Sequence, residues 1–477
     1  MAAPSPAGKK VLRVGLLTPV RTLDPLKYSD GVSRLAIVQV FETPYAQPPR
    51  LGDPLRARLF DGPLVPEAPG VLSAGIASGA AFSDGTPVTA ARVAESLSRV
   101  GVVAAQARVE ARGERVVFTL ASPNPRFDLS LTTGQCAVVL EKGADLLGSG
   151  AFVPAPGASL ERLRLVRNPR YRRPVALDEV SFDVYPPDAD GRPGALLQAL
   201  EAGQVDFTTM VSRDDSASLQ GVRKALRPAN ATAILHLNTT RRALADRRVR
   251  QAVCAAIDRR ALTELCYSNA LAFVAGSLLP PGMGTTTDRL AFDPARARSL
   301  LAAAGVGTPL RLELVVIWAP RPYLPKPGPV AALLARQLAE VGIQLTVTQP
   351  HDSEAYIQRK DRGDYDLTLA GWIADTPDPA EFLDANLRSD RVPRPGRKGV
   401  AGSNLSRLAD PAMDGALRSY REDPNAANLE VVLARVADEA PLLALMYGPT
   451  IVLSSFRLQN VEVSLLGLAD FATFDLA

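Results

Sequence analysis

Short apolar runs alternate with longer amphipathic segments over most of this chain, and this alternation places the fold in the α/β class. The order strand, helix, strand over residues 180–207 favours a parallel connection. The runs predict strands at residues 11–17, 180–185, 205–207, 343–347, 365–369, 442–447 and 451–453. The amphipathic segments predict helices at residues 195–200, 248–265, 294–304, 330–340, 353–362 and 429–440.

The length of 477 residues exceeds what one hydrophobic core supports, because single cores stop growing at about 250–300 residues. We therefore expect two or three domains. Residues 41–152 differ from the rest, with short β runs such as 115–120 and 137–140 and one clear helix. Asp84-Gly85 supplies a turn before that helix and Thr89 is its N-cap. This region reads as a separate, mixed α/β insertion.

Composition argues against several functions. The net charge of +4 is small, and no basic tract is interleaved with aromatic residues, so we expect no nucleic-acid partner. Three well-separated cysteines and two histidines provide neither a disulfide framework nor a metal site. No nucleophile elbow, P-loop or dinucleotide motif occurs, so we expect no catalytic residue, no cofactor and no enzyme activity.

No uninterrupted apolar run is long enough to cross a membrane. Residues 1–10 lack the apolar core of a signal peptide, which is 7–15 residues long in such segments. The sequence leaves two readings open: an export signal has been removed and the protein is periplasmic or extracytoplasmic, or Met1 is the native start and the protein is cytoplasmic.

Several blocks along the chain, in this order and spacing, resemble the peptide/nickel-type (family 5) extracytoplasmic solute-binding proteins of ABC importers. The blocks are residues 12–15 with 22–25, 82–90, 148–152, 167–171 with 177–180, 198–206, 238–239 with 249–252 and 256–259, 293–305, 371–379, and 403–406. Each block alone is a weak signal. The resemblance runs nearly from end to end.

The resemblance implies a two-lobed Venus-flytrap fold of cluster C. Residues 1–40, 153–230 and 455–477 would form a discontinuous lobe I, residues 41–152 a small α/β domain inserted in it, and residues 231–454 lobe II. Such a protein encloses a peptide or peptide-like solute between its lobes, hands it to a membrane permease and performs no chemistry. We expect a monomer. The alternative is a cytoplasmic or accessory flytrap protein that serves as a sensor and has lost transport.

The segment 371–379 combines an aromatic side chain, a carboxylate and two prolines directly after a predicted strand. A carboxylate at the mouth of a closing cleft pairs well with a free ammonium group, because exclusion of water strengthens the contact. In the resembling family the first aspartate of this motif binds the peptide amino terminus, which assigns that role to Asp375. Gly371, Trp372 and Ala374 are the neighbouring candidates. Alternatively, Asp375 and Asp378 only cap turns and Trp372 belongs to the core.

Two further segments supply weaker candidates for ligand contacts. The loop 18–23, with Arg21 and Thr22, resembles the backbone edge that pairs with the solute in relatives, although Pro19 removes one donor. Asn404 is the third candidate. The low aromatic content of 5% departs from the family's usual pocket, and neither histidine lies in a block that suggests a nickel chelate.

Overall fold

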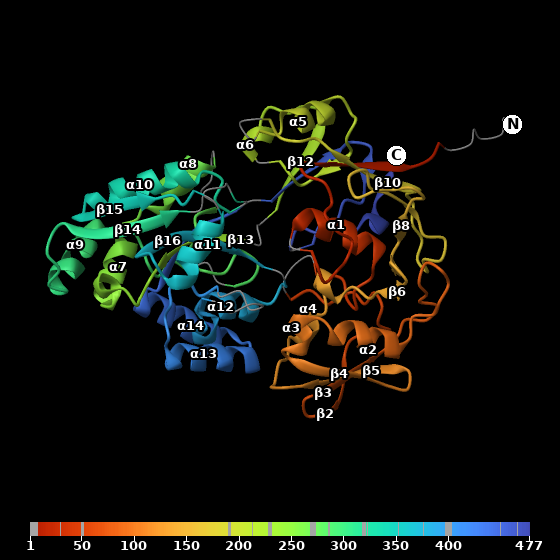
Figure 1. Cartoon of the computed structure of the whole chain (residues 1–477), viewed down its shortest axis with the longest axis horizontal. Coiled ribbons are helices and arrows are strands. Elements are labelled where there is room, and N and C mark those ends of the chain that lie inside the picture. The colour runs from red at the N-terminus through yellow and green to blue at the C-terminus, as the bar shows by residue number, and fades with distance from the viewer. Residues whose placement is uncertain are drawn as a thin grey trace. The chain divides into compact units, whose positions relative to one another are not determined.

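The computed structural model describes residues 8–477, except 29, 49–51, 189–191, 212, 228–230, 268–272, 285–286, 317–320, 322, 352, 375, 396–402, 449 and 465. The chain divides into two compact units (Figure 1). Unit 1 comprises Met1–Arg227, Asp375–Pro377 and Thr450–Ala477, and unit 2 comprises Pro228–Ala374 and Asp378–Pro449. Both units are α/β, as the alternation predicts.

A seven-stranded mixed sheet in the order β12-β18-β11-β1-β10-β9-β8 forms the centre of unit 1. Its strands are β1 (Val11–Leu16), β8 (Phe152–Pro154), β9 (Arg164–Arg167), β10 (Glu179–Val184), β11 (Phe207–Thr208), β12 (Val222–Arg227) and β18 (Thr450–Ser455). β1 pairs in parallel with both β10 and β11, which confirms the parallel connection predicted for residues 180–207.

The two faces of β1 bury different side chains. Leu12, Val14 and Leu16 point into the main core of the unit and are at most 1% exposed. On the other face a Cβ at Gly15 would lie 2.4 Å from Cδ1 of Leu196. Glycine at this position therefore lets helix α5 (Gly194–Glu201) approach the strand closely. Helix α1 (Gly31–Val40) packs in the main core, and α6 (Arg213–Ser216) is a single turn.

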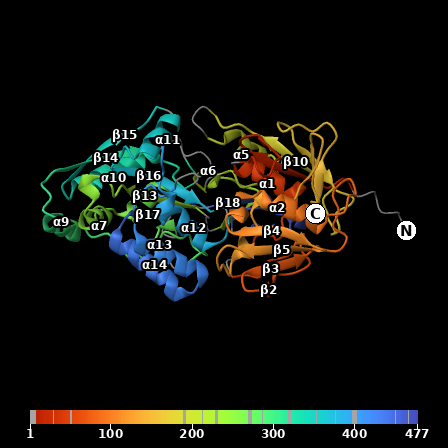
Figure 2. The ribbon, with the colours of Figure 1, turned by 60° about the horizontal axis from the view of Figure 1, so that its bottom comes forward.

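Unit 1 also contains a smaller α/β region with a hydrophobic cluster of its own. Helix α2 (Ala90–Ser98) lies against its four-stranded antiparallel sheet (Figure 2) and, as predicted, begins at the N-cap Thr89. The strand predicted at residues 137–140 is wrong, because β6 begins only at Leu140. The remaining elements are β2 (Val65–Ala68), β3 (Val71–Gly75), β4 (Ala107–Arg112), β5 (Arg115–Leu120), β6 (Leu140–Lys142), β7 (Asp145–Leu147), α3 (Gly101–Ala104) and α4 (Phe127–Ser130).

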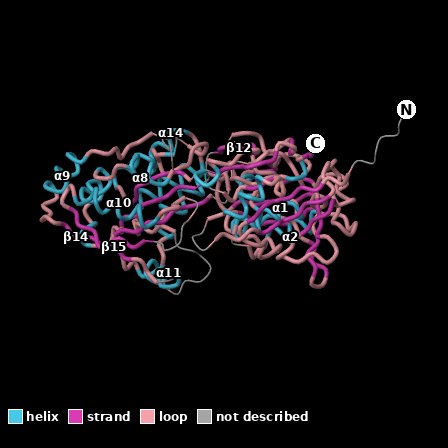
Figure 3. Tube along the Cα trace, turned by 90° about the horizontal axis from the view of Figure 1, so that it is seen from above, coloured by secondary structure: helices cyan, strands magenta, loops and turns pink. Residues whose placement is uncertain are grey.

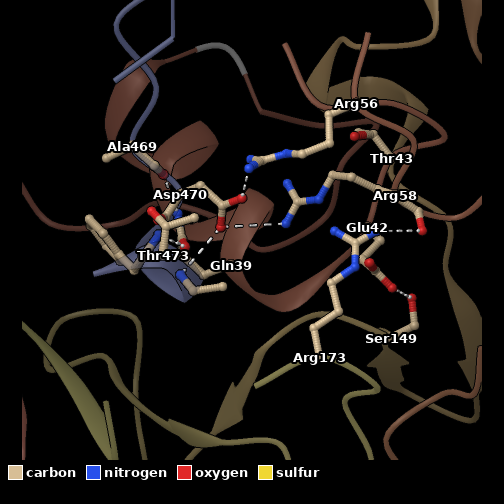
Figure 4. A network of polar contacts seen from close by, with 12 residues as sticks. Gln39, Glu42, Thr43, Arg56, Arg58, Ser149, Arg173, Ala469, Asp470 and Thr473 are labelled. Carbon is tan, nitrogen blue, oxygen red and sulfur yellow. Dashed lines mark hydrogen bonds and ion pairs between the residues drawn. The ribbon is translucent and has the colours of Figure 1, made fainter. Parts of the chain in front are cut away.

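A buried polar network connects this smaller region to the rest of unit 1 (Figure 4). Glu42 is fully buried, forms an ion pair with Arg172 at 2.6 Å and accepts a hydrogen bond from Ser149. Arg56 and Arg58 both pair with Asp470 in the C-terminal segment, at 3.2 and 3.7 Å. The C-terminal strand β20 (Asp475–Leu476) pairs with β19 (Leu458–Gln459). Residues more than 400 positions apart are thereby joined in one unit.

Unit 2 is built on a five-stranded sheet in the order β15-β14-β16-β13-β17. β14 (Leu310–Val316) is parallel to β15 (Ile343–Thr348) and β16 (Leu367–Ile373), whereas β13 (Ala231–Leu237) is antiparallel to β16 and β17 (Leu442–Tyr447). Figure 3 shows helices α8 (Arg259–Cys266) and α10 (Pro327–Ala339) beside these strands. The other helices are α7 (Arg247–Ala255), α9 (Pro294–Ala303), α11 (Ser353–Arg362), α12 (Pro379–Leu387), α13 (Pro411–Glu422) and α14 (Ala426–Glu439).

Two expectations for the second half of the chain require correction, and several helices along the chain were not predicted. The single helix predicted over residues 248–265 is two helices, because Asp258 accepts hydrogen bonds from the amides of Arg260 and Ala261 and starts α8 anew. Helices α1, α12 and α13 were not predicted. The expected lobe boundary between residues 454 and 455 falls inside β18, whose pairing with β11 and β12 places that strand in unit 1.

Candidate ligand-binding site

The strand β16 delivers Gly371 and Trp372 to one edge of the unit 2 sheet. Because β14, β15, β16 and β17 run in the same direction and only β13 opposes them, four carboxyl ends meet at this edge. Crevices that bind ligands in α/β sheets lie outside such carboxyl ends. The edge is thus the part of unit 2 where a small ligand is expected.

Gly371 is required by close packing. A Cβ on this residue would lie 2.5 Å from the backbone oxygen of Thr232 and 2.5 Å from the ring of Tyr323. The ring of Tyr323 is buried and belongs to the main core of unit 2. The glycine therefore allows an aromatic ring from a distant loop to lie directly on the strand.

Trp372 lies opposite Thr232 in the β13–β16 ladder, and its side chain is only partly buried. Its indole Nε1 is nevertheless shielded from solvent and has no hydrogen-bond partner among the residues that the structure describes. The hydroxyl of Thr232 donates to the carbonyl of Leu278 at 3.0 Å and forms no hydrogen bond with Nε1. A buried N–H without an acceptor is unfavourable, so the indole of Trp372 is a donor that the described residues leave unsatisfied.

A cation that sequence reasoning did not single out lies beside this strand. Arg321 follows β14 and its backbone forms a two-way hydrogen-bonded turn with Leu324. Its side chain is exposed and makes no ion pair with the residues that the structure describes. The charge is close enough to oppose the effect of burial on Tyr323, whose pKa is raised to about 12, and on Tyr356, whose pKa is also raised. The feature of the sequence that could have pointed to Arg321 is its position: Arg321 and Tyr323 flank a proline that follows a strand.

The segment that follows β16 contains Asp375, the main predicted ligand contact, together with residues that stabilise the fold. Asp375 lies outside the described residues. Ala374 is fully buried. Asp378 is 2% exposed and acts as the N-cap of α12, accepting from the amide of Ala380 at 2.9 Å. For Asp378 the capping alternative is therefore confirmed.

In unit 1 the loop after β1 contains the two candidates Arg21 and Thr22, which have different local hydrogen bonds. Thr22 uses its hydroxyl to accept from the amide of Asp24 at 2.9 Å, which is a local turn. The amide of Arg21 donates to the hydroxyl of Ser33 on α1, while the guanidinium is exposed. Residues 18–23 are not part of any strand, so their backbone pairs with no neighbour in the sheet.

Asn404 is fully buried in unit 2, and its side chain is occupied by the protein. The amide Nδ2 is within hydrogen-bond distance of the carbonyls of Leu387, Arg388 and Leu408, and Oδ1 accepts from Ser406 at 2.7 Å. Such a saturated amide stabilises the loop around it.

Within the described part of the chain, no three histidine, cysteine or acidic side chains are grouped as a metal site would need. None of the helices there has the length and apolar character that crossing a membrane requires. The arrangement at the β16 edge, with aromatic surface, an unsatisfied donor and a cation, has the chemistry of a binding site for a polar, partly apolar solute.

A sequence model for the middle region of bacterial extracellular solute-binding proteins, family 5, matches residues 75–393, which is more than half of the chain. Di/tripeptide-binding protein 3 of Pseudomonas aeruginosa is 26% identical over 337 residues, covering 66% of this chain but only 61% of that relative. The chain thus matches less than two thirds of this relative's length. A probable di/tripeptide-binding protein 5 of the same organism is 27% identical over 393 residues, 76% of this chain and 71% of that protein.

Solved structures match over almost the whole chain. The structure of HbpA2 from Haemophilus parasuis has a TM-score of 0.83 at 20% identity and covers 98% of this chain and 100% of that one. A dipeptide-binding protein from Pseudoalteromonas sp. SM9913, in complex with Met-Leu, has a TM-score of 0.78 at 18% identity, with the same coverage. These likenesses confirm the two-lobed binding-protein fold.

Proposed function

Because this chain belongs to the bacterial extracellular solute-binding proteins of family 5, we propose that it binds a peptide or peptide-like solute and delivers it to the permease of an ABC importer. The names of its relatives support the ligand class, since several are di- or tripeptide-binding proteins. The protein acts as a monomer outside the cytoplasmic membrane and performs no catalysis.

The observation that carries this proposal is the edge of the unit 2 sheet where β16 ends. A short peptide presents an ammonium group, a carboxylate and amide oxygens, and this edge offers a cation for the carboxylate and an N–H donor for a carbonyl oxygen. We assign Asp375 to the ammonium group, as the family motif implies, the guanidinium of Arg321, which has no ion-pair partner among the described residues, to the carboxylate, and Nε1 of Trp372 to a carbonyl oxygen. Charge-assisted hydrogen bonds of this kind are about twice as strong as neutral ones.

The loop 18–23 of unit 1, with Arg21 and Thr22, remains our second candidate for backbone contacts with a peptide. Its main chain belongs to no strand, which suits an extended peptide of any sequence because strand-like pairing uses only backbone atoms, although the amide of Arg21 already donates to Ser33. Gly371 and Ala374 shape the site without supplying polar groups. Asn404 keeps a supporting role, given its saturated amide.

Thermal-shift measurements with di- to pentapeptides test the function. A peptide that binds only the folded protein raises its melting temperature by mass action, with a gain of about 2.7 kcal/mol at one hundred times its Kd. We expect free peptides to stabilise the protein, N-acetylated peptides to lose most of the effect, and C-terminally amidated peptides to lose part of it.

Variants assign the two charged groups. Asp375→Asn should abolish the preference for a free amino terminus and Arg321→Gln the preference for a free carboxylate. Asp438→Asn is the matched control, because Asp438 is an exposed carboxylate whose partner is Arg247 on α7. No shift with any peptide would reject the peptide-binding function, and an unaltered preference in Asp375→Asn would reject that anchor alone.

A further inference from the structure

In unit 1, the turn between β18 and β19 exposes the aromatic ring of Phe456 beside positively charged side chains. Phe456 lies in the turn between β18 and β19, and at 60% its exposure is the highest of the large apolar side chains that the structure describes. β18 is antiparallel to β11, which is itself parallel to β1, so this turn lies at the amino ends of those strands. The carboxyl ends of those strands, where the loop 18–23 begins, are at the other edge.

The cation nearest to Phe456 is fixed by the backbone and not by a carboxylate. The guanidinium of Arg223, on the edge strand β12, lies 5.6 Å from the ring centroid. It donates to the carbonyls of Phe456 and Leu458, each at 2.8 Å. No described carboxylate forms an ion pair with it. The turn and its charge are therefore held together before any partner arrives, which reduces the entropy lost on binding.

Neighbouring residues add further positive charge. Lys224 is exposed, and its ammonium group donates to the carbonyl of Ala217 at 3.0 Å without a carboxylate partner among the described residues. Arg13 and Arg457 share one carboxylate, that of Asp206, so this group of three keeps one positive charge. The end of the sheet at this turn thus carries three positive charges without a described carboxylate of their own: Arg223 beside the ring, Lys224 on the opposite face of β12, and one from the group around Asp206.

We propose that this Phe456 turn, defined by Arg223, Lys224, Phe456 and Arg457, is a contact site for an anionic membrane surface. The turn presents a projecting aromatic side chain with cations near its base. This combination suits the interface of a bilayer, where aromatic rings reside and acidic headgroups attract Lys and Arg. A lipid surface needs no preformed socket for the ring, and a single turn suffices. An acidic protein surface would need to supply both a pocket and carboxylates at fixed positions.

Flotation with lipid vesicles tests the proposal. We expect the full chain to bind vesicles of phosphatidylglycerol mixed with phosphatidylcholine and not vesicles of phosphatidylcholine alone. Binding should weaken as the Debye length falls from about 30 Å at 0.01 M salt to about 8 Å at 0.15 M. Lys224→Gln should lower the partition coefficient about fivefold, the contribution of one cation near an anionic surface. Phe456→Ser should lower it by a similar or larger factor.

The matched control is the double variant Leu160→Ser with Arg162→Gln, which removes another exposed apolar side chain and a neighbouring exposed cation from unit 1. It should bind anionic vesicles like the unaltered chain, and all variants should retain the melting temperature. Equal loss in the control, or no binding to anionic vesicles at low salt, overturns the proposal. Binding to soluble polyglutamate without binding to vesicles would assign the turn to an acidic protein instead and also overturn it.

Discussion

Two buried titratable residues, one in each unit, both have lowered pKa values, but burial opposes the shift in one and causes it in the other. Asp206 of unit 1 is fully buried and receives hydrogen bonds from Arg13 and Arg457, which lower its pKa to about 2 although burial itself opposes ionisation. His236 of unit 2 is also buried, with no hydrogen-bond partner at Nδ1. Burial alone lowers its pKa to about 3.

The same direction of shift therefore has two causes. At Asp206 the charged form is the favoured one, because four guanidinium N–H groups replace the lost water. At His236 the charged form is excluded, and the side chain behaves as a neutral, poorly satisfied core residue on β13. A lowered pKa by itself does not identify a functional group, whereas the partners around it distinguish a structural ion pair from an isolated polar residue.

The replacement Asp206→Asn should have the largest effect on stability. Breaking a buried ion pair from one side costs about 3–5 kcal/mol, but Arg13 and Arg457 are 31% and 44% exposed and water compensates part of this loss. We expect a decrease of about 2–3 kcal/mol in the free energy of unfolding at neutral pH, measured by urea denaturation.

The pH dependence sharpens this expectation. Since the folded pKa is below the unfolded value of 3.8, the stabilisation by Asp206 is present above pH 3.8 and is lost as the pH falls to about 2. The variant should lack this loss. Asp438→Asn is the control, because Asp438 pairs with Arg247 at the surface and such pairs contribute at most about 1 kcal/mol. Equal effects of both substitutions would contradict the role of burial.

The replacement His236→Leu should act mainly in acid. The folded pKa of about 3 is below the unfolded value of 6.5, so the unfolded chain binds the extra proton and stability falls by about 1.4 kcal/mol per pH unit below pH 6.5. The variant escapes this loss. We expect it to match the unaltered protein at pH 7 and to be more stable by about 2 kcal/mol at pH 5, measured by urea denaturation at both values.

The second histidine provides the comparison that makes this test specific. His351 is exposed, and His351→Asn is the variant of the second histidine to measure at the same two pH values. If His236→Leu loses stability as steeply as the unaltered protein between these values, then His236 is not the acid-sensitive group.

Local signals predicted the elements that depend on neighbouring residues. The strand at residues 442–447 was predicted with the bounds it has, and Asp293-Pro294 starts α9 as expected. Helix α1 was missed because residues 32–40 are all buried, so no amphipathic pattern marks them, and several are β-branched. The break before α8 was missed because the apolar period continues across Asp258 while only the cap interrupts the helix.

For the candidate site, the motif after β16 was readable but its surroundings were not. The sequence predicted a strand leading into Gly371 and Trp372, and the structure has it. The contact of Tyr323 with Gly371 joins residues 48 positions apart through a loop, and no local pattern encodes such packing. Asn404 was read as a ligand contact because its saturation comes from carbonyls of a neighbouring segment that only the fold brings near.

Gly371 and Gly415 differ in how closely their surroundings are packed. The substitution Gly371→Ala should destabilise unit 2 and weaken peptide binding. The added Cβ would lie 2.5 Å from Thr232 and from the ring of Tyr323, so strand or ring must move, at a cost of about 1–2 kcal/mol. Movement of Tyr323 also displaces Arg321. Gly415→Ala in helix α13 is the control, because nothing lies within 4 Å of its Cβ, and there alanine should stabilise by up to about 1 kcal/mol. Urea denaturation and peptide titration measure both effects.

Trp372→Phe should have the smallest effect on stability and distinguishes Trp372 from His236, the other residue with a buried ring nitrogen that lacks a partner. The substitution removes the unsatisfied Nε1 while keeping an aromatic ring, so we expect a change in unfolding free energy within about 0.5 kcal/mol. If Nε1 donates to a peptide carbonyl, the variant should bind peptides about five- to tenfold more weakly, as isothermal titration measures. Unchanged affinity would show that Nε1 of Trp372, like Nδ1 of His236, is only a shielded ring nitrogen without a described partner, and the ligand contact would have to be withdrawn.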